Sequence, residues 1–593
     1  MVASENACDA WHPGLTARVP KEWRSLATIF RPENVSTDLA SAEELRSLTG
    51  LALSELVVFR PQRLALHELL IRVTADFVVP DGSRIEDLGI NFRRIAGHVL
   101  AGYLEPRMPA IVRECDAVRR RVTAAVDEAL SSLGHGAARA PARRPGWLGW
   151  LRPRDAAAPA AIPEWRVGQI AECERRAATV ADPVLKICYR ALARVLSGLF
   201  NAQGEAFGTR DIIVPLARDV AFNGVASDAI GSLIDPLLHE AAQREGYGLL
   251  PRQDRPIVIN TKGASASGKS TLRPLQKKLA GEIGARWSDF ALISPDIWRK
   301  QLLDYASLGA AYKYAGHFTA EELQIVDRKL DRYMARKFAE DRMSHLLIDR
   351  FRFDSFAPDS DEEGSNLLTR FGQTVYLFFV ITPPEQLVER AWKRGLEFGR
   401  YKAVDDTLAH SVDAYAGIPN VFFTWVRRSD KRIQFEFLDN TVPMGERPRT
   451  VAFGDNDTVN ILDVGRMLDI DRFGRVFVDA GSPEMLYPDR SLLAAEKNVG
   501  FLRRCIEGFR HVNFAARASG RIYLTIENTA PVTVDRAALD AAFLDADTRI
   551  GVQVVIGGLS GVAPRDRPRY LIRNGNRMAT LGVWGEEQGN APA

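Results

Sequence analysis

The residues best suited to chemistry lie between Gly263 and Thr271, where two glycines separated by four residues precede a lysine and two hydroxyl side chains. This spacing matches the phosphate-binding loop. In such a loop, backbone N–H groups converge on phosphate oxygens, the Lys269 ammonium faces the β- and γ-phosphates, and the Ser270 hydroxyl is a hard oxygen ligand for Mg²⁺. We predict that ATP and Mg²⁺ bind here, with ATP contacts from Gly263, Ala264, Ser265, Ala266, Ser267, Gly268, Lys269, Ser270 and Thr271.

The residues on either side of the loop favour this interpretation. Residues 256–260 form a short apolar, β-rich run, and residues 272–279 repeat apolar side chains at helical spacing. Strand, loop and helix therefore follow one another in the order that a phosphate-binding loop requires. The alternative is a Gly/Ser linker, but linkers rarely stand between a β-rich run and a basic helix.

Strands and helices continue to alternate from residue 255 to about residue 470, which predicts a parallel sheet with crossover helices. The expected strands are residues 256–260, 290–294, 345–349, 374–381 and 433–438. We predict an α/β fold whose central part is a three-layer nucleotide-kinase core of the P-loop type.

Open α/β sheets bind ligands at the carboxyl ends of their strands, so polar residues after the second strand are candidates. Asp296 follows that strand, and Arg299 comes three residues later, which places both in one helical turn. Asp296 is predicted to orient or deprotonate a substrate hydroxyl. The alternative is an ordinary first-turn aspartate that interacts with the helix dipole.

Asp349 ends the third expected strand and is predicted to hold Mg²⁺ directly or through water. The alternative for Asp349 is a helix cap or a salt bridge. Arg350 and Arg352 follow it, and we expect them to face the same crevice.

A basic run between residues 389 and 402 follows the fourth expected strand. Arg390 and Arg394 fall on one helical face, and Gly399 allows a bend before Arg400. This run is predicted to be a lid whose arginines, Arg394 and Arg400, neutralise charge on the transferred phosphoryl group and exclude water. The alternative is a solvated basic helix face.

Taken together, residues 263–270, the Asp296-x-x-Arg299 pair and the basic lid ending in Gly399-Arg400 resemble the zeta-toxin-type P-loop kinases, over about residues 255–440. The resemblance implies ATP-dependent phosphorylation of a small-molecule hydroxyl, with Lys269 and Ser270 on ATP·Mg²⁺, Asp296 as the base and Arg299 on the substrate. Family members phosphorylate a UDP-linked amino sugar, and similar bacterial effectors phosphorylate NAD. An antitoxin or another inhibitor protein is the partner that the resemblance raises.

Two other functions stay open at this point. In a nucleotide-dependent switch NTPase, water would replace the acceptor and the helical regions would respond to the nucleotide state. In an interaction scaffold, the kinase core would be degenerate, but the intact Lys269, Ser270 and Asp296 argue against that.

Composition excludes several classes of protein. The chain has 593 residues with 46% hydrophobic and 26% charged residues, which is typical of a globular protein of about three to four domains. A formal net charge of +3 does not indicate a nucleic-acid partner. The five cysteines have no CxxC spacing and are expected to be reduced thiols. No signal peptide and no run of about 20 apolar residues is present, so we expect a cytoplasmic protein, with signal-independent export left open.

The periodicity also predicts where domains begin and end. We expect an N-terminal helical domain (1–133), an Ala/Pro/Arg-rich linker (134–163), a second helical region (164–250), the kinase domain (251–470) and a C-terminal α+β region (471–593) with strands at 474–479, 521–526 and 550–556. Membrane contact through Trp147 and Trp150 of the linker is not expected, because its prolines and glycines disfavour an amphipathic helix. Since every candidate site residue lies between Gly263 and Arg400, the site is predicted to be complete without the N-terminal domain.

Overall fold

Five buried apolar runs form neighbouring parallel strands at one end of the sheet, in the order β2-β3-β1-β4-β5, with β2 at the edge. A computed structural model of the protein describes residues 8–133, 164–203, 210–350, 366–559, 561–565, 567–571 and 580–585. The five strands are β1 Ile257–Gly263, β2 Phe290–Ile293, β3 His345–Asp349, β4 Thr374–Ile381 and β5 Arg432–Asp439. Their near-continuous burial is typical of parallel strands covered on both faces, and it confirms the five strands predicted from the sequence.

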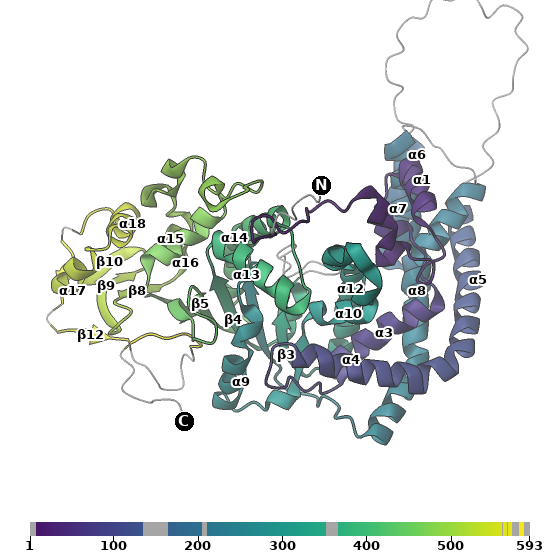
Figure 1. Ribbon diagram of the computed structural model, residues 1–593, viewed down its shortest axis with the longest axis horizontal. Coiled ribbons are helices and arrows are strands. Elements are labelled where there is room, and N and C mark those ends of the chain that lie inside the picture. Colours follow the sequence, from purple (N-terminus) through teal and green to yellow (C-terminus); the bar gives the residue numbers. More distant parts are fainter. Residues whose placement is uncertain are drawn as a thin grey trace, which may run out of the picture. The chain divides into compact units, whose positions relative to one another are not determined.

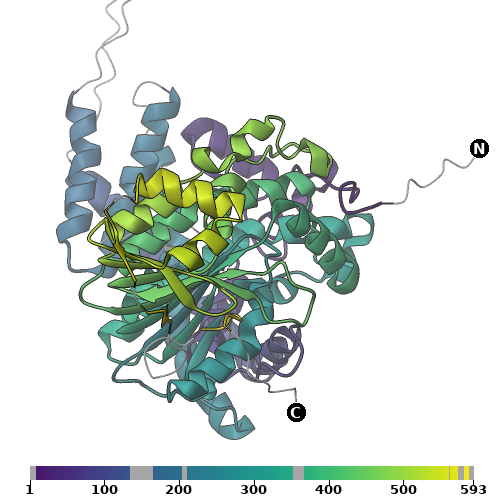
Figure 2. The same cartoon turned by 90° about the vertical axis from the view of Figure 1, so that its left-hand side faces the viewer.

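Helices connect these strands and lie on both faces of the sheet (Figure 2). The main ones are α9 Arg273–Glu282, α10 Arg299–Leu302, α11 Ala315–Phe318, α12 Ala320–Ala339, α13 Pro384–Phe398 and α14 Val404–Val426. A 3₁₀ turn, η5 Lys269–Leu272, precedes α9, and a second, η7 Pro295–Trp298, precedes α10. Each crossover thus returns the chain to the same edge of the sheet, where the loops that follow β1, β2 and β3 meet.

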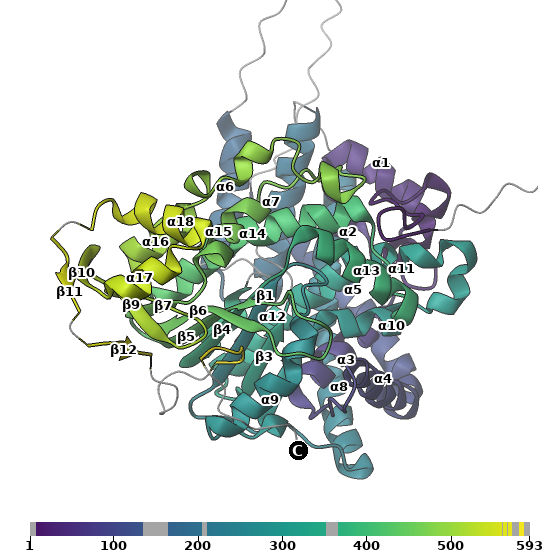
Figure 3. The same ribbon diagram turned by 60° about the vertical axis from the view of Figure 1, so that its left-hand side comes forward.

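The chain after β5 extends the same sheet (Figure 3). The strands of this part are β6 Arg449–Asp455, β7 Thr458–Ile461, β8 His511–Ala515, β9 Arg521–Glu527, β10 Ala530–Val534, β11 Ala563–Pro564 and β12 Arg569–Tyr570. With them the described residues form a mixed sheet of 12 strands, accompanied by α15 Val464–Phe473, α16 Gly500–Gly508, α17 Arg536–Ala542 and α18 Ala546–Ile556. The fold is therefore mixed α/β throughout this region.

Two of the three strands predicted in the C-terminal region are wrong. Residues 474–479 lie in a loop, and residues 550–556 belong to α18. The Asp545 carboxylate caps α18 by accepting from the Thr548 N–H, and Gly551 packs against Val464 of α15. This cap and this packing outweigh the β propensity of the valine-rich run. The third, 521–526, is confirmed as β9.

The chain divides into two compact units that cross the predicted domain boundaries. The first unit contains Met1–Trp23, Ile71–Arg94 and Tyr247–Ala593, and the second contains Arg24–Leu70 and Ile95–Gly246. Residues Ile71–Arg94, which the sequence assigned to an N-terminal helical domain, thus belong to the unit that contains the sheet. The predicted linker, with Trp147 and Trp150, lies outside the described residues.

The helices before the sheet are α1 Leu39–Thr49, α2 Leu53–Leu56, α3 Pro61–Asp76, α4 Asp87–Val99, α5 Met108–Ser132, α6 Glu164–Thr179, α7 Pro183–Gln203 and α8 Arg210–Glu245 (Figure 1). In the second unit, α5, α7 and α8 pack against one another, and α6 packs on α7. None of the described helices combines the length and apolar character needed to cross a membrane.

Arg350 does not face the crevice at the end of β3, contrary to expectation. Its guanidinium is buried against α12, where it forms ion pairs with Asp327 at 2.6 Å and Asp331 at 2.7 Å. Burial alone would lower the pKa of Arg350, but the two carboxylates outweigh it and raise the pKa. Arg350 therefore fastens the end of β3 to a helix, and Arg352 lies outside the described residues.

We predict that Arg350→Ala lowers the free energy of unfolding by about 3–5 kcal/mol, because it leaves two buried carboxylates without a counter-charge. Urea denaturation followed by circular dichroism measures the change. Lys278→Ala is the control, since the Lys278 side chain is 72% exposed and its ion pair with Glu282 is on the surface. A loss no larger than that of the control would contradict the role assigned to Arg350.

Candidate functional site

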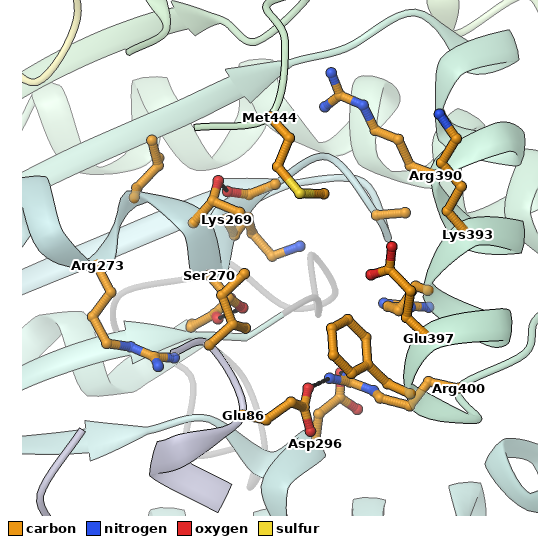
Figure 4. A pocket seen from close by; sticks show the side chains of 18 of the residues that line it. Glu86, Lys269, Ser270, Arg273, Asp296, Arg390, Lys393, Glu397, Arg400 and Met444 are labelled. Carbon is orange, nitrogen blue, oxygen red and sulfur yellow. Dashed lines mark hydrogen bonds and ion pairs between the residues drawn. The ribbon is translucent and has the colours of Figure 1, made fainter. Parts of the chain in front are cut away.

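A cavity of about 710 Å³ opens at the carboxyl ends of β1, β2 and β3. Its walls come from the Gly263–Ser270 loop, α9, η7, α13, the β5–β6 connection and the residues around Glu86, all within the first compact unit. Figure 4 shows Lys269, Ser270 and Arg273 on one side of this cavity and the side chains of α13 on the other. The predicted site residues Lys269, Asp296, Arg394 and Arg400 all line it.

The loop between β1 and α9 is held in a shape that requires glycine at position 268. Gly268 has φ +95°, and a Cβ built there would lie 2.2 Å from Nδ2 of Asn440. That amide donates to the Ser267 carbonyl at 2.7 Å, and the Thr382 hydroxyl donates to the same oxygen at 3.2 Å. The loop is therefore fixed from β4 and β5, strands that follow it by more than a hundred residues.

Lys269 curls over its own loop. Its ammonium donates to the carbonyls of Gly263 at 3.1 Å and Ala264 at 3.0 Å. Burial lowers the pKa of Lys269, an effect that the carboxylates of Asp349 and Asp296 oppose. A partly buried ammonium whose hydrogen bonds to described residues all go to neutral carbonyls is well placed to gain from an incoming anion.

Ser270 and Asp349 meet where β1 and β3 end. The Ser270 hydroxyl donates to the Asp349 carboxylate at 2.9 Å. A hydroxyl and a carboxylate are hard oxygen donors, and Mg²⁺ is commonly held by one or two such groups together with phosphate oxygens and water. The pair therefore fits Mg²⁺ as predicted, and no cluster of three or more acidic, histidine or cysteine side chains among the described residues offers a fuller protein cage.

Asp296 stands between two guanidinium groups. Arg299 donates from Nε to one carboxylate oxygen at 2.8 Å, and Arg400 donates from Nη2 to the other at 3.0 Å. Burial would raise the pKa of Asp296, but Arg299, Arg400 and Arg394 outweigh it and hold the pKa well below its usual range. Asp296 is thus ionised at every physiological pH, and its side chain remains 48% exposed to the cavity.

Arg299 is more firmly anchored than the sequence suggested. Its Nη1 donates to the Gly316 carbonyl at 2.7 Å and to the Thr319 hydroxyl at 2.7 Å, while Nε holds Asp296. Arg299 lines the cavity, as expected of a substrate-binding residue. Its Nη1 is nevertheless used to anchor the guanidinium and its Nε to orient Asp296.

The predicted lid is a helix that ends at a bend. Gly399 terminates α13 with φ +69°, and Arg400 follows it. Arg394 is directed differently from Arg390, whose Nη2 donates to the Asn440 carbonyl at 2.6 Å and so supports the β5–β6 connection. The Nε of Arg394 is buried with no acceptor among the described residues. Burial and the nearby Arg400 lower the pKa of Arg394 to about 10.

Three groups of cavity residues were missed by sequence reasoning. Arg273 lines the cavity and is 7% exposed. It lies four residues after Lys269, so its charge and its helical spacing from Lys269 could have identified it as a candidate site residue. The β5–β6 connection contributes Met444, which is 82% exposed at the cavity rim. Glu86 and Arg93 come from a segment more than 170 residues before the loop, and no local pattern connects them to it.

The prediction that the site is complete without the N-terminal region is therefore wrong for the cavity walls. Residues Ile71–Arg94 are joined to the rest of the first unit by the Val78 N–H, which donates to the Gly248 carbonyl at 2.8 Å, and by the Trp298 indole, which donates to the Thr74 hydroxyl at 3.1 Å. Removing this segment would remove one wall of the cavity.

Comparison with known proteins found no matching protein-family model, no matching curated protein and no matching solved structure.

We predict that Gly268→Ala lowers the melting temperature, because the φ of +95° costs a residue with a Cβ about 1–2 kcal/mol and the Cβ would displace the Asn440 amide. Gly281→Ala is the matched control, since position 281 lies in α9 and a Cβ there meets nothing within 4 Å. Differential scanning calorimetry of both variants measures the effect. A melting temperature of Gly268→Ala equal to that of the unmodified protein would show that the loop accepts a Cβ at position 268 without strain.

Proposed function

We propose that the protein is an ATP-dependent kinase with a P-loop core that transfers the γ-phosphoryl group to a hydroxyl of a small molecule. One observation carries the proposal, namely the Ser270–Asp349 hydrogen bond, which joins the loop after β1 to the end of β3 within a single cation-lined cavity. Asp296 faces the same cavity from the end of β2. Phosphoryl transfer requires three groups: a loop that binds phosphates, an oxygen pair that holds Mg²⁺ and a carboxylate that orients the acceptor.

In this mechanism the protein chiefly positions groups and balances charge. Lys269 would leave its loop carbonyls for the β- and γ-phosphates of ATP, a change favoured because an anion is a stronger acceptor than a carbonyl. Ser270 and Asp349 would hold Mg²⁺, which neutralises phosphate charge when bound. The acceptor oxygen forms a bond to the γ-phosphorus while the bond from that phosphorus to the β–γ bridging oxygen breaks, and ADP leaves.

Asp296 would accept a hydrogen bond from the acceptor hydroxyl and receive its proton as the new bond forms. Its lowered pKa makes it a weak base, so orientation of the hydroxyl is its larger contribution. Arg394 and Arg400 would stabilise charge on the transferred group. A nucleotide-sugar or dinucleotide acceptor follows from the resemblance to zeta-toxin-type kinases, and the many arginines of the cavity support an acceptor that is itself anionic.

Incubation of the protein with γ-labelled ATP, Mg²⁺ and a cell metabolite extract tests the proposal. Label in a metabolite would support the kinase, whereas label in free phosphate alone would favour a nucleotide-dependent switch. Label in neither product would leave the cavity without the proposed activity and would count against both.

Lys269→Ala should abolish consumption of ATP while the circular dichroism spectrum stays unchanged, because it removes the charge that faces the β- and γ-phosphates. Unchanged consumption in this folded variant would contradict the assignment of the loop. Lys278→Ala, on the exposed face of α9, controls for loss of positive charge.

Asp296→Asn should lower the rate of phosphoryl transfer by roughly 10²-fold or more and change nucleotide affinity little. The amide keeps the shape of the side chain but cannot accept the proton. Turnover and the affinity for a fluorescent ATP analogue are measured side by side. Equal loss of both would make Asp296 a structural group and not part of the acceptor site.

A further inference from the structure

Glu86 lies in the Ile71–Arg94 segment of the first compact unit, and its carboxylate lines the cavity (Figure 4). It immediately precedes α4, and its backbone carbonyl accepts from the Ile90 N–H at 3.0 Å, so it caps the helix. The turn before it is fixed by Asp87, whose carboxylate accepts from the N–H groups of Ser83 and Arg84 at 2.9 Å each. Its backbone is therefore held in place by local hydrogen bonds.

The Glu86 side chain faces a group of arginines. Its carboxylate forms an ion pair with Nη1 of Arg400 at 3.6 Å, and both side chains are about one quarter exposed. Burial lowers the pKa of Arg93 and of Arg394, and the Glu86 carboxylate opposes that effect in both. The Nε of Arg394 is buried and has no hydrogen-bond partner among the described residues.

The charge balance of this group depends on Glu86. Arg93, Arg299, Arg394 and Arg400 all line the cavity; Asp296 contacts both Arg299 and Arg400, whereas Glu86 contacts Arg400. The carboxylates of Asp296 and Glu86 favour the charged form of Arg394, whereas Arg400 and Arg299 disfavour it. Without Glu86, repulsion among the guanidinium groups would push Arg400 and the end of α13 outward.

We propose that Glu86 is a positioning residue that holds Arg400 against Asp296 and keeps the lid arginines together until an anionic ligand takes over as their counter-charge. The proposal rests on the proposed kinase function, and it makes residues Pro80–Arg93 a working part of the site. Glu86 itself would not contact the reacting atoms. Its carboxylate would be repelled by phosphate, so its contribution is to the geometry of the arginines and not to nucleotide affinity.

The test compares Glu86→Gln with Glu282→Gln in the full-length protein. Glu282 ends α9, does not line the cavity, and is 53% exposed in a surface ion pair with Lys278, so its variant removes the same charge without releasing a cavity arginine. The first measurement is hydrogen–deuterium exchange of residues 397–402, including the Gly399 N–H that donates to the Gly395 carbonyl at 2.9 Å. The second is turnover of Mg·ATP with the metabolite extract, alongside affinity for a fluorescent ATP analogue.

Glu86→Gln is expected to speed exchange in residues 397–402 by about tenfold and to lower kcat by about tenfold, with nucleotide affinity unchanged or up to severalfold tighter. Glu282→Gln should leave exchange and kcat within about twofold of the unmodified protein, and Glu86→Asp, which keeps the charge, should restore most of kcat. A purely structural role would instead weaken nucleotide affinity and kcat together.

Exchange and kcat of Glu86→Gln that equal those of the unmodified protein would overturn the proposal, as would faster exchange with unchanged kcat. An unmodified protein that transfers no phosphoryl group would count against the proposed function. In that case the exchange comparison alone would still decide whether Glu86 holds Arg400.

Discussion

The Asp296 carboxylate, held by Arg299 on one oxygen and by Arg400 on the other, is the interaction on which the geometry of the site depends. Arg299 is fastened to backbone and hydroxyl oxygens near α11, so one side of this bridge is fixed. Arg400 follows Gly399, the residue that ends α13, so the other side of this bridge lies in the segment after that helix. The ion pairs therefore connect the rigid end of β2 to the lid, and their strength is greatest where water is excluded.

The parallel sheet supplies the constraint that brings the other groups together. Parallel strands with crossover helices direct all their carboxyl ends to one edge, so the residues after β1, β2 and β3 share one cavity. The buried ion pairs of Arg350 with Asp327 and Asp331 fasten the end of β3 to α12, one residue beyond the carboxylate that contacts Ser270. A structural arginine and a candidate metal ligand are thus adjacent in sequence but serve opposite sides of the strand.

The Ile71–Arg94 segment belongs to the unit that contains the sheet, although it lies far before the sheet in sequence. The predicted kinase domain, residues 251–470, would by itself leave the cavity open beside Arg400, where Glu86 and Arg93 complete the wall. Under the proposed function, this arrangement makes the site depend on chain segments far apart in sequence. It also gives the arginines a counter-charge in the absence of nucleotide, which an isolated core would lack.

The local features of this protein could be predicted from its amino-acid sequence. The glycine spacing, the hydroxyl after Lys269 and five apolar runs predicted the loop and the parallel strands, because backbone conformation and strand burial follow from short stretches of chain. Asp296 and Asp349 could be found because they follow such strands directly. The valine-rich run at 550–556 was misjudged because the Asp545 cap and contact with α15 decide its conformation.

Which charged side chains contact one another depends on packing between distant parts of the chain. Nothing near Glu86 in the sequence indicates Arg400, since their ion pair depends on the path of the chain across more than 300 residues. The same holds for Asn440 on the loop and for Arg350, whose burial beneath α12 removes it from the cavity. Electrostatic contacts of this kind act over a few ångströms in space and leave no periodic pattern in the chain, so packing alone reveals them.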